Sequence, residues 1–368
     1  MTVNVGIIGT SWWADAMYLP ALDTHPHGKV TAICGRNRQA AQEIADRWHI
    51  PQVFTDYAEM IERGGVDAVI VSTPNDTHHD IVLKALDARK HILCEKPLAL
   101  NYTQAKQMAD LADERGVKNL VPFTYRHMPT NRYLKELIDG DYIGKPYHLN
   151  LRYNASYGRN TNYVWRFDVS KAGAGAVGDI GSHFLSLAYW FFGDVTSVSA
   201  SLSRHVQRTT HTPSGEPYPI ADDLAMLMLD FANGAQGFVQ ASTISHEPTS
   251  YGHTHHLELH GSEGTLYSFI DWEKTQRITG ARADEPGGFQ ELPIPDSVWG
   301  TVRRDTVVNT YKDVFRTQDF MAREFVTAIA EDQPLAPDFQ EGAKIQRLID
   351  AAVKSHAERR WVDVEEIQ

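Results

Sequence analysis

The sequence predicts an α/β protein of two domains, a doubly wound parallel sheet followed by a domain with a mostly antiparallel sheet. Three observations predict this order. The chain has 368 residues, which is too long for one ordinary core. Strand-like and helix-like segments alternate as far as residue 123. Beyond that point, tight turns join neighbouring strand-like runs. We therefore expect a first domain over residues 1–123 and a second over 124–368.

The first third of the chain has the pattern of a parallel sheet. The run Asp67–Val71 is almost continuously apolar, which is typical of a central strand buried on both faces. The expected strands are 3–8, 29–34, 53–54, 67–71, 91–94 and 119–123, and the expected helices are 14–22, 38–48, 57–63, 79–88 and 103–115. Repeated strand–helix units imply right-handed crossovers and a doubly wound sheet.

The remainder has hairpin signals instead. Ala232-Asn233-Gly234 separates two alternating runs, and Asn-Gly at such a place favours a tight hairpin. The expected strands are 222–231, 235–244, 256–260, 265–269 and 361–364, the expected helices are 128–139, 183–192, 319–331 and 339–359, and 206–219 is expected to be a surface loop. The last helix is long enough to pack back on the first domain.

Composition limits the possible partners. There are 47 acidic and 35 basic residues, giving a net charge of −12, which argues against a nucleic-acid partner. No apolar run approaches membrane-spanning length, and the N-terminus has no signal segment. Cys34 and Cys94 lie in apolar runs and are expected to be buried thiols. We expect a cytoplasmic protein that does not associate with membranes.

The first strand ends in a partial dinucleotide fingerprint. Against G-x-G-x-x-G/A, the matching positions are Gly9, Ser11 and Ala14. Serine replaces the glycine that normally lets the backbone approach the pyrophosphate, although its hydroxyl is able to bond a phosphate oxygen. A generic strand-to-helix turn would look similar, so this motif alone leaves both possibilities open.

The end of the second strand indicates the form of the cofactor. An acidic residue usually holds the ribose 2′-hydroxyl of NAD there, but this chain has Cys34-Gly35-Arg36-Asn37-Arg38. The guanidinium of Arg36 suits a 2′-phosphate, so NADP is favoured over NAD. The alternative is a solvated arginine.

Two further strand exits carry polar residues. Thr73, Pro74 and Asn75 follow the fourth strand, where a cofactor ribose or nicotinamide would pass, although the same segment could simply cap the next helix. Lys96 follows the fifth strand within Glu95-Lys96-Pro97. Proline keeps the preceding residue extended, and ligands bind at the carboxyl edge of parallel sheets.

The second domain supplies a candidate acid–base pair. A glycine-rich segment leads to Asp179 and His183, which are expected on one face of a helix, with Asp179 near its positive end. The alternative is a capping aspartate and a core histidine. Together with Lys96, the pair suits oxidation of a secondary alcohol. His183 would accept the hydroxyl proton, Lys96 would stabilise charge on the oxygen, and Asp179 would orient the substrate or the histidine.

These motifs, in this order, resemble the Gfo/Idh/MocA family, the glucose–fructose oxidoreductase and inositol dehydrogenase type. The resemblance covers essentially the whole chain. It is carried by the first-turn motif, Thr73-Pro74-Asn75 with His78, Glu95-Lys96-Pro97, Asp179-x-x-x-His183, Trp165-Arg166 and residues 257–264.

The resemblance implies a Rossmann domain, a second α/β domain with a large open, mostly antiparallel sheet, and homodimers or homotetramers formed through that sheet. It implies that the Lys96–Pro97 bond is cis and that the substrate is a sugar, an inositol or a keto form of one. The implied cofactor-binding residues are Gly9, Thr10, Ser11, Trp12, Trp13, Arg36, Thr73, Pro74, Asn75, His78, Glu95 and Lys96.

Substrate-side residues are expected after the last strand of the first domain and in a polar loop. The candidates are Tyr125, Arg126, Tyr153, Tyr157, Trp165 and Arg166, and the loop also holds Arg152, Asn154, Asn160 and Asn162. His253, His255 and His256 suggest zinc, but on a strand only the first two share a face, and we expect no metal site.

The sequence therefore predicts an NAD(P)-dependent oxidoreductase acting on a secondary alcohol or ketone of a sugar, cyclitol or related polyol. Two alternatives stay open. One is a redox-neutral glycoside-cleaving enzyme that retains its cofactor, and the other is a nucleotide or sugar sensor without turnover.

Overall fold

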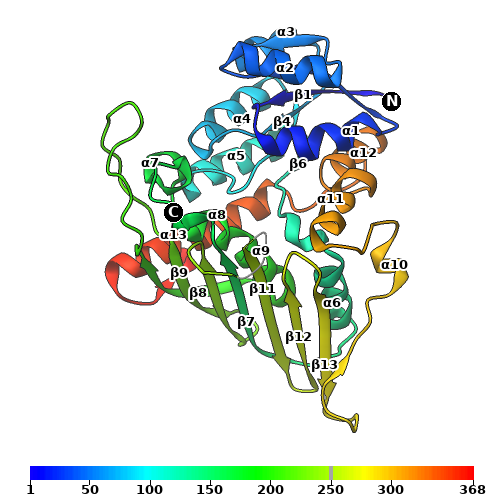
Figure 1. Ribbon diagram of the computed structural model, residues 1–368, viewed down its shortest axis with the longest axis vertical. Coiled ribbons are helices and arrows are strands. Elements are labelled where there is room, and N and C mark those ends of the chain that lie inside the picture. Colours follow the sequence, from blue (N-terminus) through cyan, green and yellow to red (C-terminus); the bar gives the residue numbers. More distant parts are fainter. Residues whose placement is uncertain (248–251) are drawn as a thin grey trace. The chain divides into compact units, whose positions relative to one another are not determined.

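The computed structural model describes residues 1–247 and 252–368. By its internal contacts the chain forms two compact units. Unit 1 comprises Met1–Phe123 with Lys312–Gln346, and unit 2 comprises Thr124–Tyr311 with Arg347–Gln368. Figure 1 colours the chain along its sequence, so the late orange segments of unit 1 are easily found among its blue and cyan elements.

Unit 1 is built on the predicted parallel sheet. Its six strands lie in the order β3-β2-β1-β4-β5-β6, and every neighbouring pair is parallel. The strands are β1 Val3–Ile8, β2 Gly28–Cys34, β3 Gln52–Phe54, β4 Ala68–Val71, β5 His91–Cys94 and β6 Asn119–Leu120. The order reverses between β1 and β4, the position at which such sheets bind dinucleotides. The prediction of a doubly wound sheet is confirmed.

Three helices of unit 1 begin at local capping signals. Side chains of Asn37, Asp56 and Asn101 accept backbone N–H bonds at the starts of α2, α3 and α5. The helices are α1 Leu19–Asp23, α2 Arg38–Trp48, α3 Tyr57–Arg63, α4 His78–Asp87 and α5 Tyr102–Arg115, with a 3₁₀ turn at Asn75–Thr77. The helix expected over 14–22 instead begins as a π-helix, Ala14–Tyr18.

A segment from far along the chain completes the core of unit 1. The helix α12, Ala322–Glu331, packs against α1, β1 and β2. Its apolar stripe, including Phe325 and Val326, belongs to the same buried cluster as Val3 and Ile33. The amphipathic pattern of α12 is readable in the sequence, but the sheet that it covers is not.

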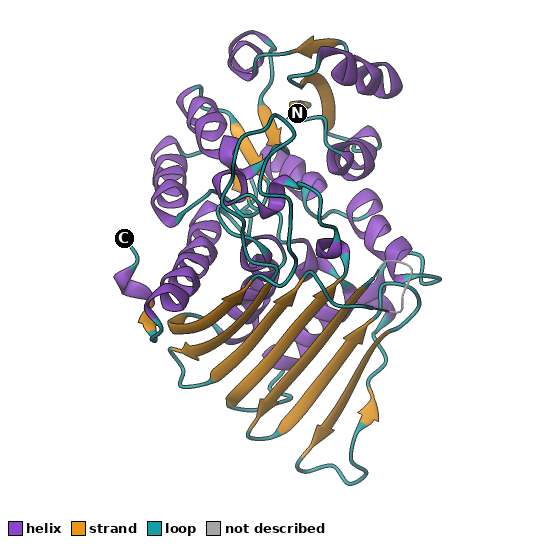
Figure 2. Cartoon of the chain, turned by 60° about the vertical axis from the view of Figure 1, so that its left-hand side comes forward, coloured by secondary structure: helices purple, strands orange, loops and turns teal. Residues whose placement is uncertain are grey.

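Unit 2 contains a large sheet, drawn in orange in Figure 2. Its nine strands lie in the order β14-β13-β12-β11-β7-β10-β9-β8-β15. Only the central pair, β7 with β10, is parallel among the strands described. The strands are β7 Pro146–Ala155, β8 Val195–Ser203, β9 Leu224–Phe231, β10 Gln236–Ser242, β11 His253–Gly261, β12 Gly264–Ile270, β13 Gln276–Arg282, β14 Gln290–Glu291 and β15 Val362–Asp363. The prediction of a large, mostly antiparallel sheet is confirmed.

The expected polar loop around Arg152, Tyr153 and Asn154 is wrong, because these residues lie in β7 at the centre of the sheet. Leu149, Leu151 and Tyr153 face the core, while Arg152 and Asn154 point to the opposite face. Polar residues on that outer face hide the strand pattern in the sequence. The strands β8 and β13 were also not predicted.

Helices cover one face of this sheet, and among the described residues the other face has exposed apolar side chains. The helix α9 packs on β7 and β10, and strand burial alternates accordingly. Leu227 and Leu229 of β9 are buried, whereas Met226 and Met228, which alternate with them, are 41% and 49% exposed. The remaining helices are α6 Pro129–Asp139, α7 Val169–Ala172, α8 Ala176–Asp179, α9 Gly181–Phe192, α10 Asp296–Trp299, α11 Val307–Thr317 and α13 Phe339–Glu358, with 3₁₀ turns at Thr124–His127, Tyr157–Arg159, Trp165–Phe167 and Val364–Glu366.

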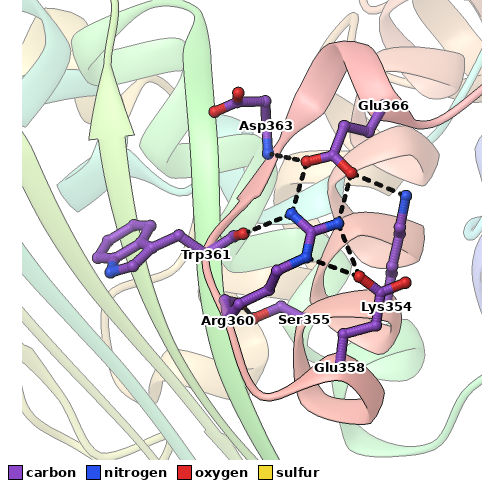
Figure 3. A network of polar contacts seen from close by, with 7 residues as sticks. All are labelled: Lys354, Ser355, Glu358, Arg360, Trp361, Asp363 and Glu366. Atoms are coloured by element: carbon purple, nitrogen blue, oxygen red, sulfur yellow. Dashed lines mark hydrogen bonds and ion pairs between the residues drawn. The ribbon is translucent and has the colours of Figure 1, made fainter.

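The end of the chain is folded back by an ion-pair network (Figure 3). Arg360 bonds both Glu358 and Glu366, and Lys354 bonds Glu366 at 2.9 Å. Exposed pairs of this kind add little stability. Their effect is geometric, since the bend buries Val362 and lets β15 cover the edge strand β8. None of the described helices is long and apolar enough to cross a membrane.

A stability prediction follows from Glu324 on α12. Its Oε2 atom is buried without a hydrogen-bond partner among the described residues. Burial, with Asp319 nearby, raises its pKa from the ordinary 4.5 to about 7. A raised carboxyl pKa means that the folded state prefers the proton. This contribution to stability is complete below pH 4.5 and is lost as the pH rises through 7.

We expect Glu324→Gln to be more stable than the wild type by about 1–3 kcal/mol at pH 8 and equally stable at pH 4. Urea unfolding at both pH values measures the difference. The exposed acid Glu331, on the same helix, provides a control, because Glu331→Gln should change neither value. A difference that does not depend on pH would contradict this account.

Candidate active site

The nucleotide turn of unit 1 requires glycine at its first position. Gly9 has a φ of +119°, and a Cβ there would lie 2.2 Å from the carbonyl oxygen of Ser72. The next fingerprint position, Ser11, is bonded within the protein. Its Oγ accepts from the backbone N–H of Ala14 at 3.1 Å and lies 2.7 Å from the Ser72 hydroxyl. The turn is thus tied to the exit of β4.

The residues around this turn differ in exposure. Trp12 is 69% exposed, while Trp13 packs edge-on against Tyr18 with ring centroids 6.4 Å apart. Thr10 lies so close to Gly35 that a Cβ on Gly35 would be 2.5 Å from the threonine methyl. Contacts of these residues with a dinucleotide stay a prediction.

At the end of β2 the only charged residues in 34–38 are two exposed arginines. Asn37 caps α2, which leaves the Arg36 side chain directed away from the core. Burial, with the Asp56 carboxylate nearby, raises the pKa of Cys34 to about 11. Asp56 itself caps α3 by accepting the N–H of Ala58 at 2.7 Å.

His78 joins two of the predicted segments from inside the core. It is fully buried, with Nε2 3.0 Å from the carbonyl oxygen of Thr73 and Nδ1 3.2 Å from that of Pro97. Burial lowers its pKa. A fully buried side chain does not reach a bound dinucleotide, so we revise the expected cofactor contact of His78 to a supporting role. Thr77 bonds back to Thr73 at 2.7 Å and does not cap α4.

The Glu95-Lys96-Pro97 segment follows β5 as predicted, and the Lys96–Pro97 bond is cis. The hydroxyl of Tyr18 donates to one carboxylate oxygen of Glu95, and the Lys96 N–H donates to the other at 3.3 Å. Tyr18 comes from the π-helix that follows the nucleotide turn. A π-helical insertion rotates the residues after it around the helix axis, and such insertions are frequent at functional sites.

In unit 2, Asp222 shapes the approach to Asp179. Its buried carboxylate accepts the N–H groups of Gly175 at 2.8 Å and Val177 at 3.0 Å. A Cβ on Gly175 would lie 1.9 Å from the Asp222 carbonyl oxygen, so only glycine fits. Burial raises the pKa of Asp222, and the two backbone bonds oppose the rise. The chain is therefore fixed at Gly175 and Val177, just before Asp179.

Asp179 does not open the long helix, and this part of the prediction is wrong. It is the last residue of α8, and His183 belongs to α9, which begins at Gly181. Its carboxylate accepts from the Tyr157 hydroxyl at 2.6 Å and pairs with Arg166 at 3.4 Å. The Arg166 guanidinium also lies 4.5 Å from the Trp165 ring centroid. Four of the predicted residues are thus brought together.

His183 lies against Tyr125, which in turn contacts Tyr153. The Tyr125 ring centroid is 4.3 Å from that of His183, and the Tyr125 and Tyr153 hydroxyls are 2.8 Å apart. Burial holds the pKa of both tyrosines well above the usual value. Arg126 bonds the hydroxyl and the carbonyl oxygen of Ser186 through its guanidinium and so supports α9. Contact of Arg126 with a substrate stays a prediction.

One wall of unit 2 is formed by Tyr125, Tyr153, Tyr157, Asp179 and His183. Three further residues contribute to this wall and were not predicted as site residues. The buried Arg208 bonds the carbonyl oxygens of Asn160 and Gly158 and lies 3.6 Å from the Phe167 ring centroid, holding the segment that carries Tyr157. Asp222 and His253 are the others. The pair Asp222-Asp223 before an apolar strand could have indicated buried carboxylates. The sequence around Arg208, a polar loop, gives no sign that this arginine is buried. Among the described residues, no cluster of three His, Cys, Asp or Glu side chains could hold a metal ion.

Comparison with known proteins extends this description. Residues 3–123 match the family model for the NAD-binding Rossmann fold of an oxidoreductase family, and residues 135–364 match its C-terminal alpha/beta domain. Levoglucosan dehydrogenase of Pseudarthrobacter phenanthrenivorans is 30% identical over 99% of both chains. The NAD(+)-dependent scyllo-inositol 2-dehydrogenase of Bacillus subtilis is 32% identical over 69% of both.

A solved structure of levoglucosan dehydrogenase in complex with NADH and levoglucosan matches with a TM-score of 0.87 and 28% identity, covering 99% of this chain and 100% of that one. Both halves of the sequence thus match one family, and the two sheets have its fold. The chain belongs to the Gfo/Idh/MocA family of oxidoreductases.

Proposed function

We propose that this protein is an NAD(P)-dependent dehydrogenase that transfers hydride between nicotinamide and a secondary alcohol or ketone of a sugar, cyclitol or related polyol. The observation that carries the proposal is the wall of unit 2, on which Tyr157 and Arg166 hold Asp179 and the His183 ring packs on Tyr125. The matched relatives named above oxidise levoglucosan and scyllo-inositol, both neutral polyhydroxy compounds.

Each unit has a part in this reaction. Unit 1 binds the dinucleotide through the segments at the carboxyl edge of its sheet, and unit 2 binds the polyol. The predicted domains, residues 1–123 for the dinucleotide and 124–368 for the substrate, correspond to these roles. The segment Lys312–Gln346, however, packs with unit 1. The bound nicotinamide supplies the hydride chemistry.

In the proposed reaction, residues of this chain accept the hydroxyl proton and stabilise the negative charge on the oxygen. His183 takes the proton of the reacting hydroxyl, since imidazole ordinarily titrates near neutral pH. Lys96 donates to the same oxygen and stabilises negative charge on it. Asp179 accepts from a substrate hydroxyl. Tyr157 and Arg166 keep its carboxylate fixed, so the substrate meets a site that needs little rearrangement.

Lys96→Met tests the function. We expect kcat on the reactive polyol to fall at least about 100-fold, because the oxygen loses its charged donor. The dissociation constant of the nicotinamide cofactor should change little. A screen of sugars and inositols, followed by nicotinamide absorbance, identifies the substrate and measures the loss.

Lys90→Met, at the other end of β5, is the matched control and should keep wild-type kcat. Unchanged kcat in Lys96→Met would remove the lysine from the mechanism. Glycoside cleavage without net nicotinamide reduction would replace the proposal by the redox-neutral alternative, and nucleotide binding without any turnover would replace it by a sensor.

The choice between NADP and NAD as the cofactor rests on Arg36. An exposed arginine without a carboxylate in residues 34–38 supports NADP, whereas the NADH in the matched structure supports NAD. We keep NADP as the proposal for this chain. Arg36→Ala should raise the KM for NADP about tenfold and leave that for NAD nearly unchanged. Arg38→Ala is the control, and equal changes for the two cofactors would reject the assignment.

We also propose a homodimer or homotetramer formed through the uncovered face of the nine-stranded sheet. Met226, Met228 and Tyr267 are exposed on it between polar side chains. Met228→Lys should shift the sedimenting species toward the monomer, while Val353→Lys, at an exposed position of α13, should not. A wild type that sediments as a monomer would reject this assembly. The two free, buried cysteines fit the cytoplasm, where we propose that the enzyme works.

A further inference from the structure

Three histidines on β11 have different surroundings, although they are nearly adjacent. His253 and His255 point to the covered face of the sheet, and His256 points to the other face, where it packs on Phe269 with centroids 4.8 Å apart. His255 is fully buried, and its Nε2 accepts from the Trp272 indole N–H at 3.1 Å. His255 is therefore a core histidine with a fixed tautomer.

His253 lies nearer the proposed substrate wall. Its ring is only partly buried, and its centroid is 5.8 Å from that of Tyr153 and 6.4 Å from that of Tyr157, the residue that bonds Asp179. Asp179 is also close enough to oppose the effect of burial on its pKa. His253 therefore belongs to the group of residues around Asp179, although a different strand carries it.

The neighbouring tyrosines bear on the tautomer of His253, because the direction of their hydrogen bonds decides which ring nitrogen carries the proton. Burial lowers its pKa to about 4, so at neutral pH it carries one ring proton. Its Nδ1 lies 3.4 Å from the Tyr153 oxygen, and the Tyr153 and Tyr125 oxygens are 2.8 Å apart. Both tyrosines stay protonated because burial raises their pKa values. When Tyr125 donates to Tyr153 and Tyr153 donates to Nδ1, the imidazole proton lies on Nε2.

We propose that His253 presents this Nε2–H group to one hydroxyl oxygen of the substrate and so helps to determine which polyol is accepted. The inference rests on the proposed function and deepens it. A neutral donor suits a hydroxyl oxygen, whereas the Asp179 carboxylate suits a hydroxyl proton. With both, the site distinguishes the orientation of neighbouring hydroxyls. A site built to bond a hydroxyl rejects analogues that lack it.

The kinetic test uses His253→Leu, which removes the donor, and His253→Gln, whose amide N–H reaches the position of Nε2. On the best substrate from a panel containing levoglucosan and myo-inositol, His253→Leu should lose about tenfold in kcat/KM. His253→Gln should recover most of that loss. His256→Leu and His256→Gln, on the opposite face of the same strand, should equal the wild type.

Monodeoxy analogues of that substrate separate recognition from a structural effect. One analogue should be a poor substrate for the wild type and should react equally with wild type and His253→Leu, because the missing hydroxyl is the partner of His253. An equal loss on every analogue would overturn the proposal. Failure of the wild type to oxidise any polyol would instead reject the proposed function, and the spectroscopic test below then decides the inference.

Nitrogen-15 NMR of the full chain labelled at histidine needs no turnover. At pH 7 we expect the His253 signals of a neutral ring with the proton on Nε2, and a changed tautomer population in Tyr153→Phe. Addition of millimolar levoglucosan or myo-inositol should shift the Nε2 signal. A proton on Nδ1, or no shift of Nε2 with a polyol that the enzyme oxidises, would overturn the proposal.

Discussion

Asp222 lies buried at the start of β9, and its carboxylate accepts two backbone N–H groups of the segment that leads to Asp179. Its neighbour Asp223 accepts those of His205 and Val206 and lies 3.9 Å from buried Arg208. Removing a carboxylate from water is costly, and backbone donors offset the cost only when they are correctly placed. The position of Asp179 therefore depends on this contact, because a shift of the backbone would leave the carboxylate buried without its donors.

In unit 1, a buried neutral side chain fixes the backbone of two loops, where unit 2 uses a buried carboxylate. Backbone carbonyls in buried loops need hydrogen-bond partners, and His78 lies between those of Thr73 and Pro97. A neutral imidazole costs less to bury than a carboxylate, in line with the lowered pKa of His78. In both units, buried side chains position the segments that carry the proposed catalytic residues. Tyr18, which donates to Glu95, acts in the same way on the segment containing Lys96.

Sequence reasoning succeeded where the deciding information is local. Apolar runs, caps and turn residues are short-range signals, so the parallel sheet of unit 1 and the hairpin from β9 to β10 were predictable. Features that depend on packing against residues far away in the sequence were not predicted. The outer face of β7 is polar although the strand is central, and α12 covers a sheet almost 300 residues earlier in the chain. Spacing alone suggested one helix for Asp179 and His183, but it does not reveal the break at Ile180.

The charges around Asp179 also bear on the kind of substrate. Arg166 is paired with this carboxylate, and burial keeps Tyr125, Tyr153 and His253 uncharged near neutral pH. This wall of unit 2 thus offers a compensated charge pair and neutral hydrogen-bonding groups. A phosphate or carboxylate would need a cation of its own there, and Arg166 could supply one only by releasing Asp179. A neutral polyol has no such cost, because its hydroxyls donate to the carboxylate and accept from neutral donors.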